Sequence, residues 1–317
     1  MEDLFTGTTG AWLGLTLAIT VLLIVDLLIL RGRGGAMSTR AAVVTSIVWV
    51  AISLAFAGVL LALGTQEQAE AYLAGYIVEK SLSLDNVFVF LIVFGAFAIP
   101  EIRRARLLTY GIVLALVLRL AFILVGAAAL KQASWLSIPF GLFLLWTGWK
   151  LWQDRHSHGG EEKLVEGVRD RLPIAAGEAG AADSLTTRVD GKLLLTAAGA
   201  TLVTIALVDI IFAVDSVPAI LAITTDTFVV FAANAFALLG LRPLFFLVAD
   251  LVERLYYLKA ALALLLIFIA GKMLLSEVIG KVAPQYSLGG VVLILGAGVA
   301  ASLLRQRRLR RAPGAAV

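Results

Sequence analysis

Long apolar segments separated by short polar loops run through almost the whole chain. A helix needs about 20 apolar residues to cross the hydrocarbon core of a bilayer, and most of these segments approach or exceed that length. One longer polar segment, 153–192, is rich in charge, Gly and Ala, shows little periodicity, and is predicted to be a flexible linker. The remaining pattern predicts nine membrane-spanning helices, at 11–30, 42–63, 72–97, 107–130, 134–152, 193–221, 227–249, 258–276 and 288–304.

The composition agrees with this pattern. Of 317 residues, 61% are hydrophobic and 15% are charged, and the mean hydropathy is +0.98, whereas a soluble domain has about 25% charged residues. These values predict an all-α polytopic membrane protein, so the net charge of +4 says little about nucleic acid. The chain has no cysteine, which excludes disulfides, thiolate metal sites and cysteine nucleophiles.

Basic residues lie almost entirely on one side of the predicted membrane. The loops after odd-numbered spans and the tail hold most of them, while the opposite side has Lys131 and Lys281 and little else. The positive-inside rule therefore predicts an external N-terminus and a cytoplasmic C-terminus. The acidic stretch Met1–Gly10 does not fit a cleaved signal peptide. The chain divides into 1–152, the cytoplasmic linker 153–192, 193–304, and a basic tail 305–317 that we expect to contact anionic lipid head groups.

Two of the predicted spans carry the same unusual pattern of acids. Glu79 and Asp85 lie six residues apart in the third span, and Asp209 and Asp215 repeat that spacing in the sixth, each pair followed by a small polar residue and a valine. An ionisable group at membrane depth costs roughly 2.5 kcal/mol or more on insertion scales, so a functional role is the default interpretation. These four acids are our candidate ligands for a cation.

The spans that follow each acid pair also match. Each acid span precedes a span with one arginine, Arg119 or Arg242, and then a span with Gly and Lys near its end. A three-helix unit that occurs twice must be inverted the second time, which is a common plan of secondary transporters. We therefore predict a 3+3 inverted repeat of spans three to five and six to eight, with the substrate site near the midplane between the units.

The residues around the acids favour a hard cation. Carboxylate, amide and hydroxyl oxygens, without Cys or intramembrane His, suit Mn²⁺, Mg²⁺ or Ca²⁺ better than Zn²⁺ or Cu⁺. Desolvation favours the protonated form of a carboxylate, so the same groups could exchange metal for protons. The supporting polar residues at helical spacing are Ser83 and Asn86 after Glu79, and Ser216 after Asp209.

The six-residue spacing sets a condition on helix geometry. On a regular helix it corresponds to about 240° of rotation and about 9 Å of rise, so the two acids of a pair would not face the same way. We expect the helices to be broken there. Pro218 would free the carbonyl of Val214 beside Asp215. Regular helices would instead leave two separate acid layers.

Several other polar residues have two interpretations. Arg119 and Arg242 are interpreted as counter-ions of the acids, although either could reach an interface, and Lys80 is ambiguous in the same way. Asp26 either has a functional role or reaches the cytoplasmic interface near Arg31. Asn234 fits an interhelical hydrogen bond. His156 and His158 in the linker could bind a metal weakly or be solvated.

The motifs resemble a known family. The segments Glu79-Lys80-Ser81-Leu82-Ser83-Leu84-Asp85-Asn86-Val87 and Asp209-Ile210-Ile211-Phe212-Ala213-Val214-Asp215-Ser216-Val217-Pro218 closely resemble the TerC/Alx family of integral membrane proteins, as do 234–242 and 271–275. The resemblance covers most of the chain and implies a multi-pass protein of the bacterial inner membrane. It implies the LysE-type transporter superfamily, manganese export and, in name, tellurium resistance. It also implies that Glu79, Asp85, Asp209 and Asp215 coordinate the metal and exchange protons.

Three functions are compatible with these observations. The first is a proton-driven exporter of divalent cations, with Mn²⁺ as the expected substrate, no permanently bound cofactor and no nucleic-acid partner. The second is a non-transporting membrane scaffold or assembly factor. The third, an intramembrane enzyme, ranks last because the chain has neither a zinc-binding HExxH motif nor a Gly-x-Ser-x-Gly elbow.

Overall fold

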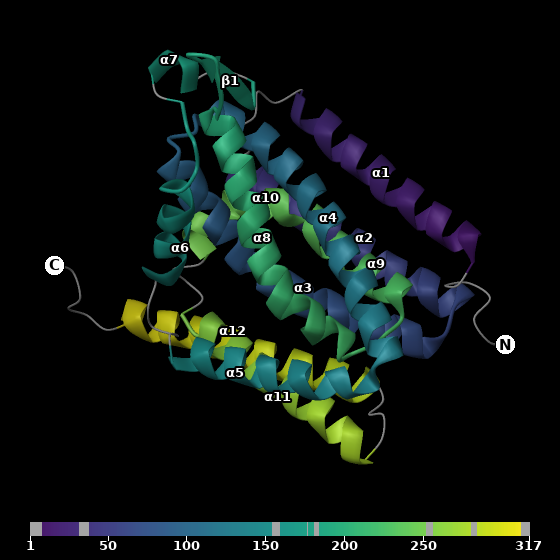
Figure 1. Cartoon of the computed structure of the whole chain (residues 1–317). Helices are drawn as coiled ribbons and strands as arrows, with labels where there is room; N and C mark the ends of the chain where they lie inside the picture. Colours follow the sequence, from purple (N-terminus) through teal and green to yellow (C-terminus); the bar gives the residue numbers. More distant parts are fainter. Residues whose placement is uncertain are drawn as a thin grey trace.

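The structure is a computed structural model that describes residues 8–31, 38–153, 159–175, 177–180, 184–251, 256–279 and 284–311. The described chain is almost entirely helical, with one small β-hairpin (Figure 1). Its elements are α1 Thr9–Arg31, α2 Thr39–Leu63, α3 Gln66–Ala96, α4 Glu101–Gln132, the 3₁₀ turn η1 Ser134–Leu136, α5 Ser137–Gln153, α6 Gly159–Arg169, α7 Gly177–Gly180, β1 Thr186–Val189, β2 Lys192–Leu195, α8 Ala197–Leu221, α9 Thr227–Leu239, α10 Leu241–Leu251, α11 Leu258–Ile279 and α12 Pro284–Arg311.

The prediction of an all-α polytopic membrane protein is confirmed. Every one of the nine predicted spans contains helix, and in the described residues six helical stretches are long and apolar enough to cross a membrane. These six lie in α1, α2, α4, α8, the pair α9–α10, and α12. The others fall short because α3 carries several charged residues, α5 has only 17 residues, and the apolar part of α11 is limited to Ala260–Ser276.

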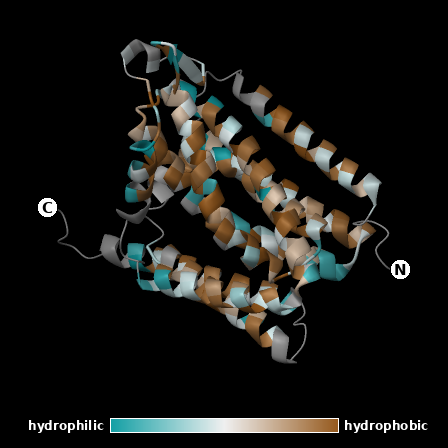
Figure 2. Ribbon diagram, in the orientation of Figure 1, coloured by the Kyte–Doolittle hydropathy of each residue, from teal (hydrophilic) through white to brown (hydrophobic). Residues whose placement is uncertain are grey.

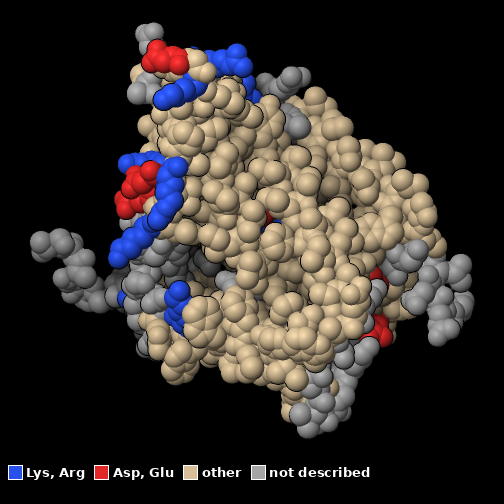
Figure 3. All heavy atoms as spheres, in the orientation of Figure 1, with Lys and Arg blue, Asp and Glu red and all other residues tan. Residues whose placement is uncertain are grey.

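Hydrophobic side chains cover both the interior and most of the exterior. Figure 2 shows apolar residues along the full length of the long helices, and Figure 3 shows an uncharged surface over most of one face, with charge gathered beside α6 and the hairpin. Helices such as α1 and α2 expose large apolar side chains, including Leu13, Ile47 and Leu61. A surface of this kind fits lipid rather than water, whereas α9 is buried along nearly its whole length.

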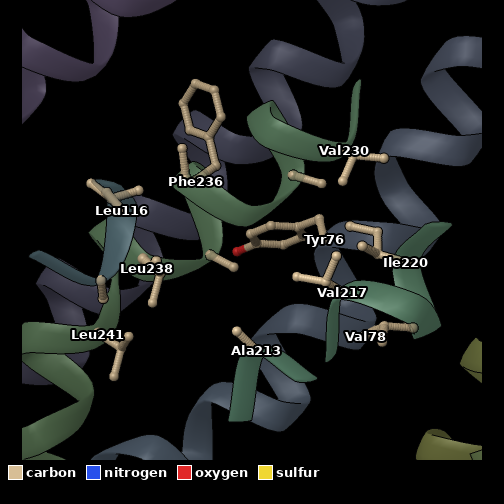
Figure 4. Packing of buried hydrophobic residues seen from close by; sticks show 14 of the residues in the cluster. Tyr76, Val78, Leu116, Ala213, Val217, Ile220, Val230, Phe236, Leu238 and Leu241 are labelled. Atoms are coloured by element: carbon tan, nitrogen blue, oxygen red, sulfur yellow. The ribbon is translucent and has the colours of Figure 1, made fainter. Parts of the chain in front are cut away.

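The core is formed where α3, α4, α8 and α9 meet. Figure 4 shows Tyr76 of α3 lying among Val217 and Ile220 of α8 and Phe236 of α9. A Cβ added at Gly111 of α4 would lie 3.3 Å from Ile205, and one added at Gly126 would lie 3.0 Å from Leu221, so α4 and α8 run parallel in close contact.

Several predicted boundaries differ from the structure, including the start of the sixth span, which lies at Ala197 because Lys192–Leu195 form a strand. Two further differences have a local cause. The third span begins earlier, at Gln66, because Thr65 and Gln68 form a capping box in which each side chain accepts from the other's backbone N–H, at 3.2 and 3.1 Å. The seventh span is two helices rather than one. It is interrupted at Gly240, whose N–H donates to the carbonyl of Leu238 instead of continuing the helix.

The segment 153–192 was predicted to be a flexible linker, and the structure instead gives it secondary structure. The helix α6 packs on α3 and α8 through the fully buried Val165, and Arg169 donates to the carbonyl of Ala96 at 3.5 Å. The hairpin β1–β2 turns at Asp190 and Gly191, which have φ values of 50° and 76°. An Asp-Gly pair suits such a two-residue turn, and this was the missed signal. His156 and His158 lie outside the described residues.

Candidate cation site

Two of the predicted acids meet on one arginine in the interior. Glu79 of α3 and Asp209 of α8 have 1% and 3% of their surface exposed, and Arg119 of α4 has 1%. The Nη1 of Arg119 donates to Oε2 of Glu79, while its Nε and Nη2 each donate to Oδ1 of Asp209 at 3.4 Å. One guanidinium thus joins an acid from each of the two repeated motifs.

Both acids of this cluster have unpartnered oxygen atoms. The second oxygen of each acid, Oε1 of Glu79 and Oδ2 of Asp209, is buried and has no hydrogen-bond partner among the described residues. The fully buried Asn234 of α9 lies beside the Glu79 carboxylate, but its amide does not reach hydrogen-bond geometry with that group or with any other described residue. About 10 Å further along α3 and α8, the Nδ2 of Asn86 and the Oγ of Ser216 are also buried without a partner in the described chain. A buried polar group without a partner costs about 1–3 kcal/mol, so these atoms make the cluster a candidate binding site.

The face of α3 that carries Glu79 is polar over four turns. Glu79, Ser83 and Asn86 are all buried, with Ser83 donating to the carbonyl of Lys80 at 2.8 Å. Sequence reasoning missed that Tyr72 and Tyr76 extend this face. They precede Glu79 by seven and three residues, which was the available signal. Both tyrosines are buried, and Tyr72 donates to the carbonyl of Ser53 in α2 at 3.1 Å.

The expected helix breaks do not occur. Both α3 and α8 are continuous α-helices through their acid motifs, and α8 includes Pro218. Pro218 lies close to the end of α8, where it removes only one donor, and the next turn is held by the bond from Ala222 N–H to the Pro218 carbonyl at 3.0 Å. The Val214 side chain is 43% exposed. The structure therefore has the alternative arrangement, in which the two acids of one helix lie about 9 Å apart along its axis.

The second acid of each motif is placed only by its backbone. Asp85 and Asp215 lie on α3 and α8, but their side chains are outside the described part of the structure. Among the described side chains, no group of three or more carboxylates or imidazoles lies close enough to hold a metal ion. The described site therefore consists of Glu79 and Asp209, with Arg119 between them.

Arg242 binds an acid that was not expected to be its partner. Its Nη1 donates to Oδ2 of Asp26 in α1 at 3.0 Å and to the Asp26 carbonyl at 3.4 Å, and its Nη2 donates to the carbonyl of Ala105 in α4 at 3.3 Å. Arg242 and Asp26 are 2% and 7% exposed, so neither reaches an interface. The pair joins α1, α4 and α10, and Arg242 has no ion pair with Asp209.

Lys80 was interpreted either as a counter-ion or as a residue that reaches an interface, and the structure gives it another partner. Its ammonium group donates to the carbonyl of Ala237 at 3.1 Å, and no described carboxylate lies within ion-pair distance of it. The carbonyls in the last turn of α9 have no partners within that helix, so a cation there is favourable. Lys80 thus stabilises the interruption at Gly240.

Lys272 is the lysine near the end of the eighth predicted span. In the structure it has hydrogen-bond partners on two other helices. It is 9% exposed and donates to Oγ of Ser287 in α12 and to the carbonyl of Ala222, the C-cap of α8, at 3.4 Å. Its position therefore links α8, α11 and α12. The sequence signal for this role was a lysine within an apolar segment, because ionisable groups in such helices usually have polar partners.

Comparison with known proteins gives a consistent result. Residues 64–310 match the model of the "Integral membrane protein TerC family". The chain is 37% identical over 304 residues to an uncharacterized membrane protein of Myxococcus xanthus, covering 95% of this chain and 94% of the relative. It is 40% identical over 283 residues to the "Putative membrane-bound redox modulator Alx" of Escherichia coli K12, covering 86% and 87%. An uncharacterized membrane protein of Rickettsia felis is 34% identical, with 94% and 99% covered. No solved structure matches.

Proposed function

This chain belongs to the TerC family of integral membrane proteins, and from that premise we propose that it exports divalent metal cations, with Mn²⁺ as the principal substrate and protons as the counter-transported ion. One observation carries the proposal. Two fully buried acids from separate helices share one arginine, and each acid has a second oxygen that no described residue satisfies.

The donor set fits a hard cation. Glu79 and Asp209 each offer one carboxylate oxygen and Asn234 an amide oxygen, and none of these buried atoms has a hydrogen-bond partner in the described chain. The buried hydroxyl of Ser216 lies about 10 Å further along α8, where it could serve an ion beside Asp215. Oxygen donors of this kind suit Mg²⁺, Ca²⁺ and Mn²⁺. The family resemblance favours Mn²⁺ among these three ions. Efflux and proton coupling also rest on that resemblance.

Asp85 and Asp215 complete the proposed pathway. Continuous helices place each of them about 9 Å along the axis from Glu79 or Asp209, so we assign them to separate positions rather than to one shared coordination sphere. An ion would then pass between successive acid positions. Acids released by the ion can take protons on the return step, which would couple export to proton entry.

The proposal includes nine membrane crossings, an external N-terminus and an inverted repeat. In support, α3 and α8 carry the acids, α4 and the α9–α10 pair carry the arginines, and α5 and α11 follow them in the same order. The third helices of the two units also pack on each other, as a two-fold axis between the units would require. There, a Cβ added at Gly148 of α5 would lie 2.9 Å from Ile267 of α11.

Transport into inverted membrane vesicles tests the proposal. Vesicles that contain the protein should accumulate Mn²⁺ when their lumen is acidic, and Asp85→Asn or Asp215→Asn should abolish the accumulation. Glu67→Gln is the matched control because Glu67 lies on α3 at an exposed position. The assignment fails if the two aspartate variants transport Mn²⁺ as well as the wild type.

A scaffold that assists other membrane proteins is the second candidate. The observation that favours this function is that α6 and the hairpin β1–β2 form a structured surface outside the long helices. This function would survive neutralisation of all four acids and would be lost on deletion of 159–195. The name redox modulator, carried by relatives, has no thiol basis here, because the chain has no cysteine.

A further inference from the structure

The charges in the acid cluster are unequal. Glu79 and Asp209 carry two negative charges when ionised, and the guanidinium of Arg119 supplies one positive charge. All three side chains are at most 3% exposed, so water does not screen the imbalance. The Arg119 guanidinium is therefore a cation that already lies between the acids, and its side chain tethers it to α4.

This arrangement makes entry of a cargo ion a competition. We infer that Arg119 is a specificity-determining residue, a tethered monovalent cation that the cargo must displace from Glu79 and Asp209, and that this displacement selects divalent over monovalent ions. The inference rests on the proposed function and adds to it a basis for charge selectivity. It assigns to Arg119 a role beyond neutralising an empty site.

The selectivity follows from the charge of the ion that replaces the guanidinium. A sodium or potassium ion that replaced the guanidinium would bring one charge in place of one charge, and the acids would lose three N–H contacts. A divalent ion brings twice the charge to the same two carboxylates and can offset that loss. The fork of donors on arginine binds carboxylates more specifically than a simple monovalent ion does.

The unpartnered oxygens provide a way to begin the exchange. Arg119 contacts only Oε2 of Glu79 and Oδ1 of Asp209, which leaves Oε1 and Oδ2 free of any described partner. A cation can thus bind one oxygen of each acid before the guanidinium leaves. The Asn234 amide beside Glu79 offers a further oxygen at that stage.

Equilibrium binding to the purified full-length protein separates this role from a merely structural one. Free Mn²⁺ is followed by electron paramagnetic resonance at constant ionic strength, with either Na⁺ or the bulky N-methylglucamine cation as the accompanying ion. Arg119→Gln is compared with Arg119→Lys, which keeps the charge but not the fork. Arg104→Gln, on the same helix and outside the acid cluster, is the matched control.

The expected results differ between the variants. The wild type and Arg104→Gln should bind Mn²⁺ with the same Kd in both salts. Arg119→Gln should bind Mn²⁺ about tenfold more tightly in N-methylglucamine, a difference of about 1.4 kcal/mol, and should lose most of that gain in Na⁺. Arg119→Lys should bind about threefold more tightly than the wild type and remain insensitive to Na⁺.

Two outcomes overturn the inference and one overturns the proposed function. A folded Arg119→Gln protein with the Kd and salt insensitivity of the wild type removes the selective role of Arg119. If Arg119→Gln does not fold, an Arg119→Lys protein that binds Mn²⁺ with the Kd of the wild type also removes the selective role of Arg119. A folded wild type that binds no divalent ion instead contradicts the proposed function, on which the inference rests.

Discussion

The two buried arginines Arg119 and Arg242 occupy similar positions in the sequence, but they bind different numbers of carboxylates. Arg119 and Arg242 each follow a leucine and lie in a helix that comes after an acid motif, and both are at most 2% exposed. Arg242 binds one carboxylate, that of Asp26, together with two carbonyls. Arg119 binds two carboxylates and no described carbonyl.

The difference lies in the ratio of acids to cations. The Asp26–Arg242 pair is neutral when both groups are charged, and it ties α1 to α10 and α4 through Nη1 and Nη2, although the buried Nε of Arg242 has no described partner. The Arg119 cluster has one negative charge in excess when both acids are ionised, and each acid keeps one oxygen without a described partner. A buried arginine is therefore not in itself evidence of a transport site. Under the proposed function, the feature that distinguishes the Arg119 cluster is that acids outnumber the arginine.

The largest expected effect comes from breaking the balanced pair. Asp26→Asn leaves the Arg242 guanidinium buried without a carboxylate, which should cost about 3–5 kcal/mol of unfolding free energy. Thermal unfolding of the purified protein measures the loss. The double variant Asp26→Asn/Arg242→Leu should recover most of it, and the folded protein should keep its Mn²⁺ affinity. A loss of affinity in the folded double variant would mean that the two arginine sites are not distinct.

Removing one acid from the unbalanced cluster should affect binding more than folding. Glu79→Gln leaves Arg119 with Asp209 as a partner, so the guanidinium stays compensated. The Mn²⁺ Kd should rise roughly 100-fold, or about 2.7 kcal/mol, because a charged ligand is lost. Calorimetric titration measures the change, with Glu67→Gln as the control. A Kd within twofold of the wild type would remove Glu79 from the site.

Asn234 should show opposite effects on stability and binding. Its amide has no described hydrogen-bond partner, so Asn234→Leu removes an unsatisfied group and should leave the fold as stable as before or slightly more stable. If the amide oxygen binds the ion, the Mn²⁺ Kd should rise about tenfold, or about 1.4 kcal/mol. Unfolding and titration of the same preparation give both quantities. A destabilised variant with unchanged affinity would indicate a structural hydrogen bond instead.

The smallest expected effect is at Lys80, the neighbour of Glu79 in sequence. Because its ammonium group binds the Ala237 carbonyl, Lys80→Gln keeps a donor at the end of α9 and should cost at most about 1 kcal/mol. Its Mn²⁺ Kd should stay within about twofold of the wild type. A tenfold change would place Lys80 with Arg119 among the groups that neutralise the acids.

The sequence was sufficient for those features that depend on periodicity. Apolar length predicted helix in all nine spans, and helical spacing grouped Glu79, Ser83 and Asn86 on the buried face of α3. Partner choice required the tertiary structure. The pairing of Arg242 with Asp26 joins helices far apart in the chain, and no local pattern encodes it. Pro218 suggested a broken helix, whereas its position near the end of α8 lets the helix continue.

The most direct test of the central claim is the location of a bound ion. We propose soaking crystals of the full-length protein with Mn²⁺ and measuring anomalous diffraction at the manganese edge. We expect a peak between α3 and α8, within coordination distance of Glu79 and Asp209, with the Arg119 guanidinium withdrawn from both acids. A peak elsewhere, or a peak at the acids with Arg119 still bound to both, would contradict that claim.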